Sequence, residues 1–278
     1  MAVTFDDLPA HGGLPPGQTR VQIAHDILAA LKAARVRSAT ALVNGVQVER
    51  EPGSEAALDL WRKADHPLGS HTWSHPHLDM VGPDAFMADI ARNEPGLAAR
   101  MAGRDWKWFR YPFMAEGATP ETRAQVRRYL AERGYHIASV TLSFDDWAFN
   151  DPYARCMTRG DMAAVAELER QYMDWARLSL ARSRGLARTL YGRDIPYVLV
   201  LHAGAFDARM LPRLLAWYRS EGFRFASLET VERHPFYRDD YDARPSDKPL
   251  SLEAEADRRG HVVPPRPWNP GSLNGVCR

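Results

Sequence analysis

The alternation of short apolar segments with amphipathic segments constrains the fold of this chain more than any other feature. The segments with strand character are Ala2–Phe5, Ala39–Val43, Pro67–Ser70, Trp108–Tyr111, Tyr135–Phe144, Tyr197–Leu201 and Phe223–Ser227. Tyr197–Leu201 is apolar throughout, which is typical of a strand buried on both faces. Strands that alternate with helices along a chain predict an α/β architecture built on a parallel sheet.

Helical patterns lie between these strands. One helix carries Ile23, Ile27 and Leu31 on a single face. Further helices are predicted over Ser54–Ala64, Pro83–Met101, Thr119–Arg133, Arg159–Tyr191 and Ala208–Ser220. Ser54 and Thr119 have the residue types of N-caps. Pro95-Gly96 should interrupt the helix predicted over Pro83–Met101.

Composition excludes several classes of function. The chain has 278 residues, of which 45% are hydrophobic, and a formal net charge of +1. The charge gives no argument for a nucleic-acid partner, and we interpret Arg123, Arg127 and Arg128 as one solvated helix face. No apolar run is long enough to span a bilayer. The first strand begins almost at Met1, so we expect no signal peptide and suspect that a natural leader was removed.

The chain changes character near Pro235. Residues 1–235 form the predicted catalytic domain, and residues 236–278 are rich in Pro, Asp, Arg and Gly. We expect this second part to be an extended tail that wraps the domain or is partly disordered. The two cysteines, Cys156 and Cys277, match no zinc motif and could be bonded to each other or free.

Reactive side chains follow five of the predicted strands. They are Asp6 and Asp7, His71 and His75, Arg110, Asp145 and Asp146, and His202. In a parallel barrel the carboxyl ends of the strands meet at one rim, where active sites are built. Each member has an ordinary structural explanation, such as a turn signal for Asp6-Asp7, but the joint pattern favours one site.

The pair His71 and His75, together with one carboxylate, predicts a metal site. Two imidazoles and one carboxylate can hold a catalytic divalent cation and leave positions open for water and substrate. The spacing of four residues would place both rings on one face if a helix begins there. Nearby His77 and Asp79 are interpreted as supporting or exposed residues.

These segments resemble the five motifs of the polysaccharide deacetylases, the family with the NodB homology domain (carbohydrate esterase family 4). The matching segments, in the family's order, are Thr4-Phe5-Asp6-Asp7, His71-Thr72-Trp73-Ser74-His75, Arg110-Tyr111-Pro112-Phe113, Asp146-Trp147 and Leu199-Val200-Leu201-His202. The resemblance implies a distorted (β/α) barrel of about seven parallel strands and a metal-dependent deacetylase. Met114 stands where the family often has glycine, which leaves the substrate open.

The resemblance also implies a role for each matching residue. Asp6 would be the general base, His202 the general acid, and Arg110 would hold Asp6 in place. Asp146 would either pair with His202 or brace Arg110. The metal ligands would be Asp7, His71 and His75, and the acetyl pocket would be lined by Tyr111, Trp147 and Leu199 or Leu201. Zinc is the expected metal, with cobalt, manganese or nickel as alternatives.

The expected partner is an acetylated glycan, either one that contains N-acetylglucosamine or an O-acetylated polysaccharide. Two other functions stay open: hydrolysis of cyclic amides or ureides without metal on the same fold, and glycan binding by an inactive relic. Acetylated wall or extracellular glycans imply a periplasmic or secreted protein, with the cytoplasm left open. The sequence does not give the oligomeric state.

Overall fold

The core of the structure is one parallel sheet of six strands. The computed structural model describes residues 1–246 and 251–278. The strands are β1 (Ala2–His11), β2 (Thr40–Val43), β3 (Leu68–Ser70), β4 (Trp108–Phe109), β5 (His136–Ile137) and β6 (Val198–Gly204). Their spatial order is β5-β4-β3-β2-β1-β6, and every pairing is parallel. The predicted α/β class is therefore confirmed.

The sheet curls into a distorted barrel. After the edge strand β5, the chain runs to the free side of the opposite edge strand β6. There Leu142 forms a parallel bridge with Leu199, and Val200 N–H donates to the Leu142 carbonyl at 3.1 Å. This connection links the two edges with few ladder bonds. The structure has six strands where the sequence predicts about seven, because the predicted strand Phe223–Ser227 is absent.

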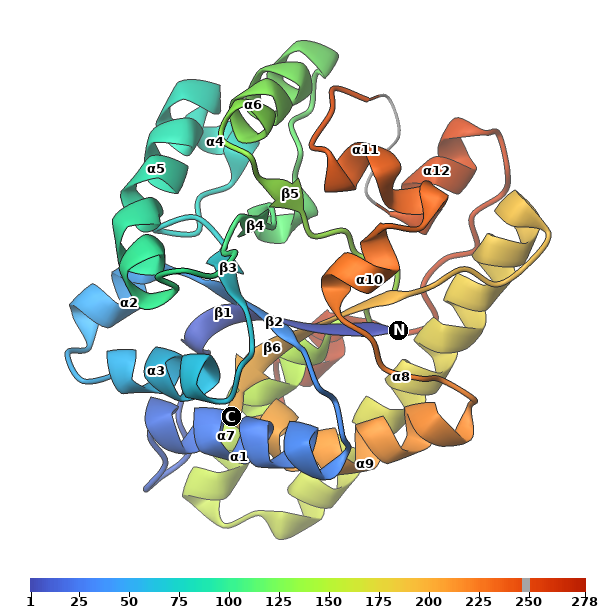
Figure 1. The fold of residues 1–278 in the computed structure, drawn as a ribbon. Coiled ribbons are helices and arrows are strands. Elements are labelled where there is room, and N and C mark those ends of the chain that lie inside the picture. Colours follow the sequence, from blue (N-terminus) through green and yellow to red (C-terminus); the bar gives the residue numbers. More distant parts are fainter. Residues whose placement is uncertain (247–250) are drawn as a thin grey trace.

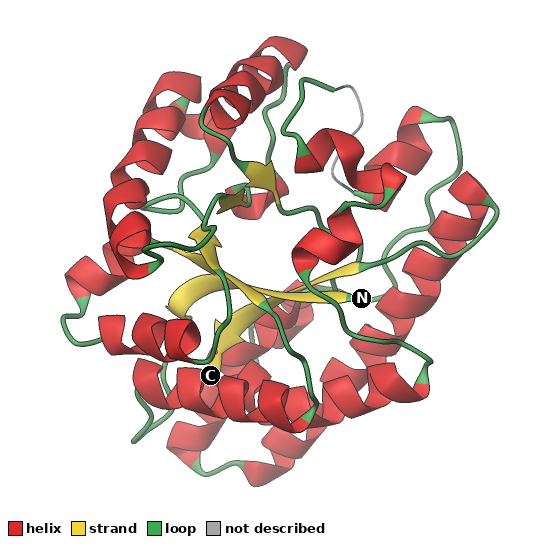
Figure 2. Cartoon of the chain, viewed as in Figure 1, coloured by secondary structure: helices red, strands yellow, loops and turns green. Residues whose placement is uncertain are grey.

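Helices surround the sheet, with the strands at the centre (Figures 1 and 2). The first group is α1 (Arg20–Ala33), α2 (Gly45–Arg50), α3 (Glu55–Lys63), α4 (Leu78–Val81), α5 (Pro83–Arg100) and α6 (Pro120–Glu132). The second is α7 (Asn150–Arg159), α8 (Met162–Tyr191), α9 (Ala205–Ser220), α10 (Leu228–Glu232), α11 (Arg238–Tyr241) and α12 (Leu252–Arg258). The 3₁₀ turns are η1 (Pro112–Met114), η2 (Asp146–Phe149), η3 (Pro235–Tyr237) and η4 (Pro270–Leu273). Among the described residues, no helix combines the length and the apolar character needed to cross a bilayer.

Apolar spacing explains how the helices attach to the sheet. In α1 the predicted face of Ile23, Ile27 and Leu31 is fully buried, and it joins the main core together with Phe5 and Leu201. Thr119 caps α6 by accepting a hydrogen bond from Thr122 N–H at 3.2 Å, as predicted. Burial of such a face supplies most of the stability of a helix in a protein.

Three local predictions are wrong. Phe223–Ser227 is not a strand, although its backbone bonds to Met1 at 2.9 Å on both sides. Helix α5 runs without interruption through Pro95, because Phe86, Ile90 and Leu97 anchor one face of it in the core. Ser54 precedes α3 but makes no side-chain cap, since its backbone is already helical. The long helix predicted over Arg159–Tyr191 is confirmed as α8, and α7 precedes it as a helix that the sequence analysis did not predict.

The predicted solvated arginine face on α6 is also wrong in one position. Arg127 is fully buried, and its guanidinium pairs with Glu116 at 2.7 Å and with Asp240 at 2.8 Å. These two carboxylates lie elsewhere in the chain, so the helix pattern alone could not reveal them. A buried arginine needs such partners because an unpaired charge in the interior is costly.

The C-terminal segment folds back onto the barrel. Cys277 forms a disulfide with Cys156 of α7, and Arg155 donates to the carbonyls of Asn274 and Val276. The question of the two cysteines, which the sequence left open, is thereby answered. The segment contains η3, α11, α12 and η4, so it is not extended throughout. Its separation from residues 1–235 as a distinct part of the protein stays a prediction.

Candidate metal centre and active site

A pocket of about 400 Å³ opens at the carboxyl ends of the strands. Its walls come from β1, the loop after β3, the turn after β4, the η2 region and β6. The lining residues are Asp6, Asp7, His11, His71, His75, Tyr111, Phe113, Met114, Ser143, Asp145, Trp147, Val200, His202 and Arg266. Parallel strand ends deliver their side chains to one rim, as the sequence predicts.

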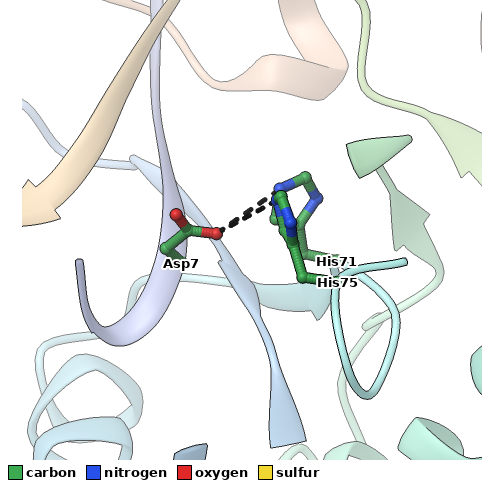
Figure 3. Close-up of side chains that lie close together, drawn as sticks. All are labelled: Asp7, His71 and His75. Atoms are coloured by element: carbon green, nitrogen blue, oxygen red, sulfur yellow. Dashed lines mark ion pairs between the residues drawn. The ribbon is translucent and has the colours of Figure 1, made fainter. Parts of the chain in front are cut away.

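Asp7, His71 and His75 converge on one point. His71 Nε2 lies 3.6 Å and His75 Nε2 3.5 Å from the same oxygen, Asp7 Oδ1 (Figure 3). One ligand atom from each residue lies within 4.8 Å of the other two. Two imidazole nitrogens and a carboxylate oxygen in this arrangement are a donor set that suits a divalent transition metal.

The histidine segment is a loop and not the start of a helix. Thr72 and His75 have positive φ values of 64° and 59°, and the next helix, α4, begins at Leu78. Two buried amides hold the loop: Asn44 donates to the His71 carbonyl at 2.5 Å, and Asn93 donates to the Thr72 carbonyl at 3.0 Å. The rings therefore converge because the loop folds back, and the helical explanation of their spacing is wrong.

The protonation of the two imidazoles fits a metal. His71 Nδ1 donates to the Arg110 carbonyl at 2.9 Å, so this nitrogen carries the proton and Nε2 is free to bind a cation. Burial and the neighbouring His71 lower the pKa of His75 to about 4, although Asp7 opposes the shift. A neutral imidazole is the form that ligates metals, so the lowered pKa of His75 suits this ring to that task.

A bulge in β1 brings two consecutive carboxylates into the same pocket. Neighbouring residues on a regular strand point to opposite faces. Here the register with β2 shifts between Phe5 and Leu8, and Asp7 has a φ of 64°. This irregularity turns Asp7 toward the histidines while Asp6 also faces the pocket. Bulges next to active sites commonly redirect a side chain in this way.

His11 is a site residue that the sequence analysis missed. Its Nδ1 lies 2.7 Å from Asp7 Oδ2, the oxygen that faces away from the two other histidines. Burial acts to raise the pKa of Asp7, but the hydrogen bond from His11 and the charges of His71 and His202 outweigh burial and lower it well below its usual range. Asp7 is therefore ionised. The available signal was the position of His11, four residues after Asp7 in a glycine-rich stretch.

Asp6 is held by a buried arginine. Arg110 Nη1 donates to Asp6 Oδ1 at 2.6 Å, and the same guanidinium bonds to Thr4 Oγ1 and to the carbonyls of Ala138 and Ser139. The other oxygen, Asp6 Oδ2, lies 3.7 Å from His71 Nε2. One carboxylate oxygen is thus fixed, and the second faces the centre of the metal cluster.

His202 pairs with Asp146 on the other wall of the pocket. Asp146 Oδ2 accepts the His202 backbone N–H at 2.6 Å, and both carboxylate oxygens lie 3.2 Å from His202 Nδ1. Burial lowers the pKa of His202, but the charge of Asp146 and its hydrogen bond outweigh burial and raise the value to about 10. Of the two partners that the sequence left open for Asp146, the structure gives His202.

The predicted substrate residues divide into two groups. Trp147 is 42% exposed at the pocket, and Phe113, which lines the same pocket, is 61% exposed. The ring of Tyr111 is fully buried and stacks on Phe86. Leu201 is also buried in the core and does not line the pocket, because alternation along β6 turns Val200 and His202 inward in its place. The assignment of Leu201, and of Leu199 on the same face, is therefore wrong.

Arg266 and Asp145 form a contact that the sequence did not reveal. Asp145 has a φ of 56° and accepts hydrogen bonds from Arg266 Nη1 at 3.0 Å and from Trp268 Nε1 at 2.8 Å. Arg266 lines the pocket, so the C-terminal segment contributes to its wall. No pattern near Arg266 pointed to this placement. His77 stacks on Phe113, and Asp79 accepts from Ala118 N–H, so neither belongs to the metal cluster.

Strained backbone gathers at this pocket. Ten non-glycine residues among those described have positive φ, and six of them lie here: Asp7, Thr72, His75, Phe113, Met114 and Asp145. Each such conformation costs about 1–3 kcal/mol and persists only where the surroundings impose it. Strain of this kind clusters at functional sites, which agrees with the convergence of the ligand atoms.

Comparison with known proteins agrees with this geometry. Residues 1–138 match the family model described as polysaccharide deacetylase. Residues 1–138, just under half of the chain, thus have the sequence of the polysaccharide deacetylase family. A peptidoglycan-N-acetylglucosamine deacetylase of Bacillus cereus is 27% identical over 147 residues, which are 53% of this chain and 46% of that protein. The chain thus aligns with less than half of that relative.

Solved structures share the fold of this chain. The Xyl-CE4 domain of a multidomain xylanase, from the hindgut metagenome of Trinervitermes trinervoides, matches with a TM-score of 0.55 at 16% identity. The match covers 84% of this chain and 88% of that domain. A CE4 family pseudoenzyme from Bacillus anthracis matches with a TM-score of 0.55 at 13% identity, over 82% of this chain and 64% of the other. Because a pseudoenzyme has this fold too, activity must be argued from the site.

Proposed function

We propose that this chain is a metal-dependent hydrolase that removes acetyl groups from a carbohydrate. The observation that carries the proposal is the position of Asp6. One of its oxygens is fixed by Arg110 at 2.6 Å, and the other lies beside the cluster of Asp7, His71 and His75. A base next to a His–His–Asp cluster, with a paired histidine on the facing wall, suits hydrolysis of an acyl bond.

Asp7, His71 and His75 would hold the metal, with zinc as the expected ion and cobalt, manganese or nickel as alternatives. When bound, such an ion lowers the pKa of water and polarises a carbonyl group. The histidine tautomer set by Arg110 and the ionised Asp7 prepare the three ligand atoms for this role.

Asp6 would accept the proton of the attacking water. A carboxylate is a weak base, so its orientation matters, and the bond from Arg110 restricts the side chain to one rotamer. Asp6 Oδ2 is the oxygen available for the proton, because Oδ1 is occupied by the guanidinium. Tyr111, whose ring is buried, would contribute its backbone to the wall of the acetyl pocket.

His202 would protonate the leaving amine or alcohol. Asp146 favours the charged imidazolium, which is the form that can donate a proton. The Nδ1 side is occupied by Asp146, so Nε2 is the nitrogen that would face the substrate. Base and acid then act from different walls of one pocket, as a reaction that removes and returns a proton requires.

The exposed rings of Trp147 and Phe113 support a sugar substrate. Aromatic faces at the rim of a pocket can pack against the apolar faces of sugar rings. The Bacillus cereus relative is a peptidoglycan-N-acetylglucosamine deacetylase, so N-acetylglucosamine in a wall glycan is the first candidate. O-acetylated polysaccharides are the second.

The disulfide supports a periplasmic or secreted protein. Cys156 and Cys277 are bonded, and disulfides form and persist in oxidising compartments. Acetylated wall glycans are found outside the cytoplasm, so compartment and substrate agree within this proposal.

The experiment is release of acetate from chito-oligomers, peptidoglycan and acetylxylan, before and after treatment with a chelator. Activity that a chelator removes and a divalent metal restores is the expected result. Activity that survives complete metal removal would favour the metal-free amidase alternative. Binding of glycans without any acetate release would favour the inactive relic.

Two substitutions assign the roles. Asp6→Asn should lower turnover by about 10²–10⁴-fold and leave metal content nearly unchanged, because it removes the base and no ligand. His71→Ala should lose both metal and activity. His25→Ala, an exposed histidine on α1, is the matched control and should change neither. Full metal content and full activity in His71→Ala would disprove the ligand set.

A further inference from the structure

A buried polar cluster lies behind His202, outside the pocket. It consists of Asp146 on η2, Tyr172 on α8, and Asp207 and Tyr218 on α9, all with relative exposures of 0%. None of the four lines the pocket. The proposed mechanism uses only Asp146, so the other three polar side chains, buried at the cost of desolvation, have no role in it.

The hydrogen bonds of this cluster are incomplete at one carboxylate and at the hydroxyl of Tyr218, which has no hydrogen-bond partner among the described residues. Tyr172 donates its hydroxyl to Asp207 Oδ1 at 2.7 Å. Asp207 Oδ2 is buried and receives no N–H or O–H from any described residue. The Asp207 carboxyl lies within hydrogen-bond reach of Asp146. Two carboxyl groups therefore meet in the interior, and one of them has an oxygen without a donor.

Two adjacent buried carboxylates cannot both be ionised without a large cost in free energy. A shared proton removes the repulsion and fills the missing bond, since a protonated carboxyl group is a donor. The pair has a clear asymmetry. Asp146 accepts the backbone N–H and the ring N–H of His202, whereas Asp207 accepts only a hydroxyl.

Charge–charge attraction therefore keeps the negative charge on Asp146, next to the imidazolium of His202. We propose that Asp207 is a neutral carboxylic acid that donates a hydrogen bond to Asp146 and so holds this carboxylate against His202. Asp207 is a positioning residue, because it touches neither the substrate nor the metal cluster. This inference rests on the proposed function of His202 as the acid.

The surroundings of Asp207 support the neutral state. Burial first, and then the charge of Asp146, raise the pKa of Asp207 far above its ordinary range. The titratable groups that face it are Asp146, Tyr172 and His202, and the Tyr218 hydroxyl faces Asp146 from the same helix. Among these, His202 alone is a cation, and it is bonded to Asp146.

The chain Tyr172–Asp207–Asp146–His202 gives Asp146 a fixed orientation. Without a donor from Asp207, the Asp146 carboxylate could rotate away from His202 Nδ1, where both of its contacts are 3.2 Å long. A supporting residue of this kind is typically worth about 10–100-fold in activity when it is removed. The effect should fall on proton donation to the leaving group and spare the base.

Asp207→Asn and Asp207→Ala test the proposal together. The asparagine amide can donate to Asp146 and accept from Tyr172, as a neutral acid does, so Asp207→Asn should keep kcat within about threefold of the wild type. Asp207→Ala should lower kcat on an N-acetylated chito-oligomer by about tenfold or more. Equal losses in the two variants would overturn the neutral-acid assignment.

The leaving group separates positioning from simple damage. 4-Nitrophenyl acetate releases a phenolate that needs no proton, so Asp207→Ala should change its hydrolysis by less than about twofold. Leu97→Ala, which opens a cavity in the core under α5, is the matched destabilising control and should affect the two substrates alike. A parallel loss on both substrates in Asp207→Ala would show that Asp207 is merely structural.

Infrared spectroscopy tests the proton without any activity. The wild-type protein near neutral pH should show the C=O stretch of a buried carboxylic acid, and Asp207→Asn should lack it. Absence of that band in the wild type would refute the inference even if the chain is an active deacetylase. Its presence in a protein that releases no acetate would refute the proposed function and leave the protonated Asp207 in place.

Discussion

Arg110 and Arg127 are two buried arginines with opposite meanings. Their side chains are 1% and 0% exposed, and each pairs with carboxylates at 2.6–2.8 Å. Arg110 follows β4 at the rim of the barrel. Arg127 lies on α6, at the outside of the sheet, where it joins this helix to α11.

The second oxygen of the aspartate partner, Asp6 in one case and Asp240 in the other, separates the two cases. Asp6 Oδ1 is bound to Arg110, while Oδ2 faces His71 in the pocket. Asp240 Oδ1 is bound to Arg127, while Oδ2 accepts from Ser139 Oγ at 2.7 Å. A buried ion pair thus marks a reactive site only when one of its oxygens still faces a cavity. When both oxygens of the aspartate are bonded inside the protein, as in Asp240, the pair stabilises the fold.

The largest effect should come from Arg110→Met. This change removes the group that orients Asp6, and we expect activity to fall by about 10³-fold while metal content stays near that of the wild type. Acetate release and metal analysis on the same preparation measure both. Retention of more than a tenth of the activity would mean that Asp6 needs no fixed orientation, and the comparison would lose its basis.

Arg127→Met should act on stability. It leaves Glu116 and Asp240 without their buried counter-charge, and we expect the free energy of unfolding to fall by about 3 kcal/mol. Activity per folded molecule should stay within about twofold of the wild type. Urea denaturation measures the free energy of unfolding. Kinetics without urea, at a temperature well below the thermal transition, measure the turnover of the folded protein. A loss of turnover larger than the loss of stability would show that Arg127 also serves the pocket.

The pair of His202 and Asp146 combines both properties, because it stabilises the fold and faces the pocket. Burial lowers the pKa of His202, but Asp146 raises it to about 10, above the value of about 6.5 for an unfolded histidine. The stabilisation is therefore complete below about pH 6.5 and is lost as the pH rises toward 10. The metal-free wild type should lose about 2 kcal/mol over this window relative to His202→Gln. Equal pH profiles in the two proteins would contradict the ion pair.

The smallest effect should come from Thr119→Ala. It removes the cap of α6 without touching Arg127, and we expect a loss of about 1 kcal/mol in stability with unchanged activity. Thermal denaturation measures it. The change shows how much of the stability lost in Arg127→Met comes from weakening of α6 alone. An equal loss of stability in Thr119→Ala and Arg127→Met would assign the whole effect of Arg127→Met to fraying of α6.

Much of the site could be predicted because the ends of the strands are encoded locally. Alternating apolar segments place Asp6, His71, Arg110, Asp146 and His202 at strand ends, and parallel pairing brings those ends together. The N-cap at Thr119 could be predicted for the same reason, since its hydrogen-bond partner is three residues away. Information within one segment sufficed in each case.

Most of the failures share a different origin. Arg127, Arg266 and His11 depend on partners or turns that are distant in sequence or irregular in backbone. The bulge at Asp7 and the folded loop at Thr72 are left-handed conformations that surrounding contacts impose, as with the amides of Asn44 and Asn93. Val200 lies on the same face of β6 as His202, so the alternation of side chains along the strand already favoured Val200 over Leu201, and the sequence analysis missed this signal.

The bond between Cys156 and Cys277 ties the stretch that carries Arg266 to the rim of the barrel. The redox conditions of purification and assay can therefore change the measured activity. Thiol reductants in a purification buffer would release that stretch from one of its anchors, and assays run with and without dithiothreitol would then report on two differently shaped pocket mouths. Preparations made in a reducing bacterial cytosol and in an oxidising host should accordingly be compared before any glycan preference is assigned.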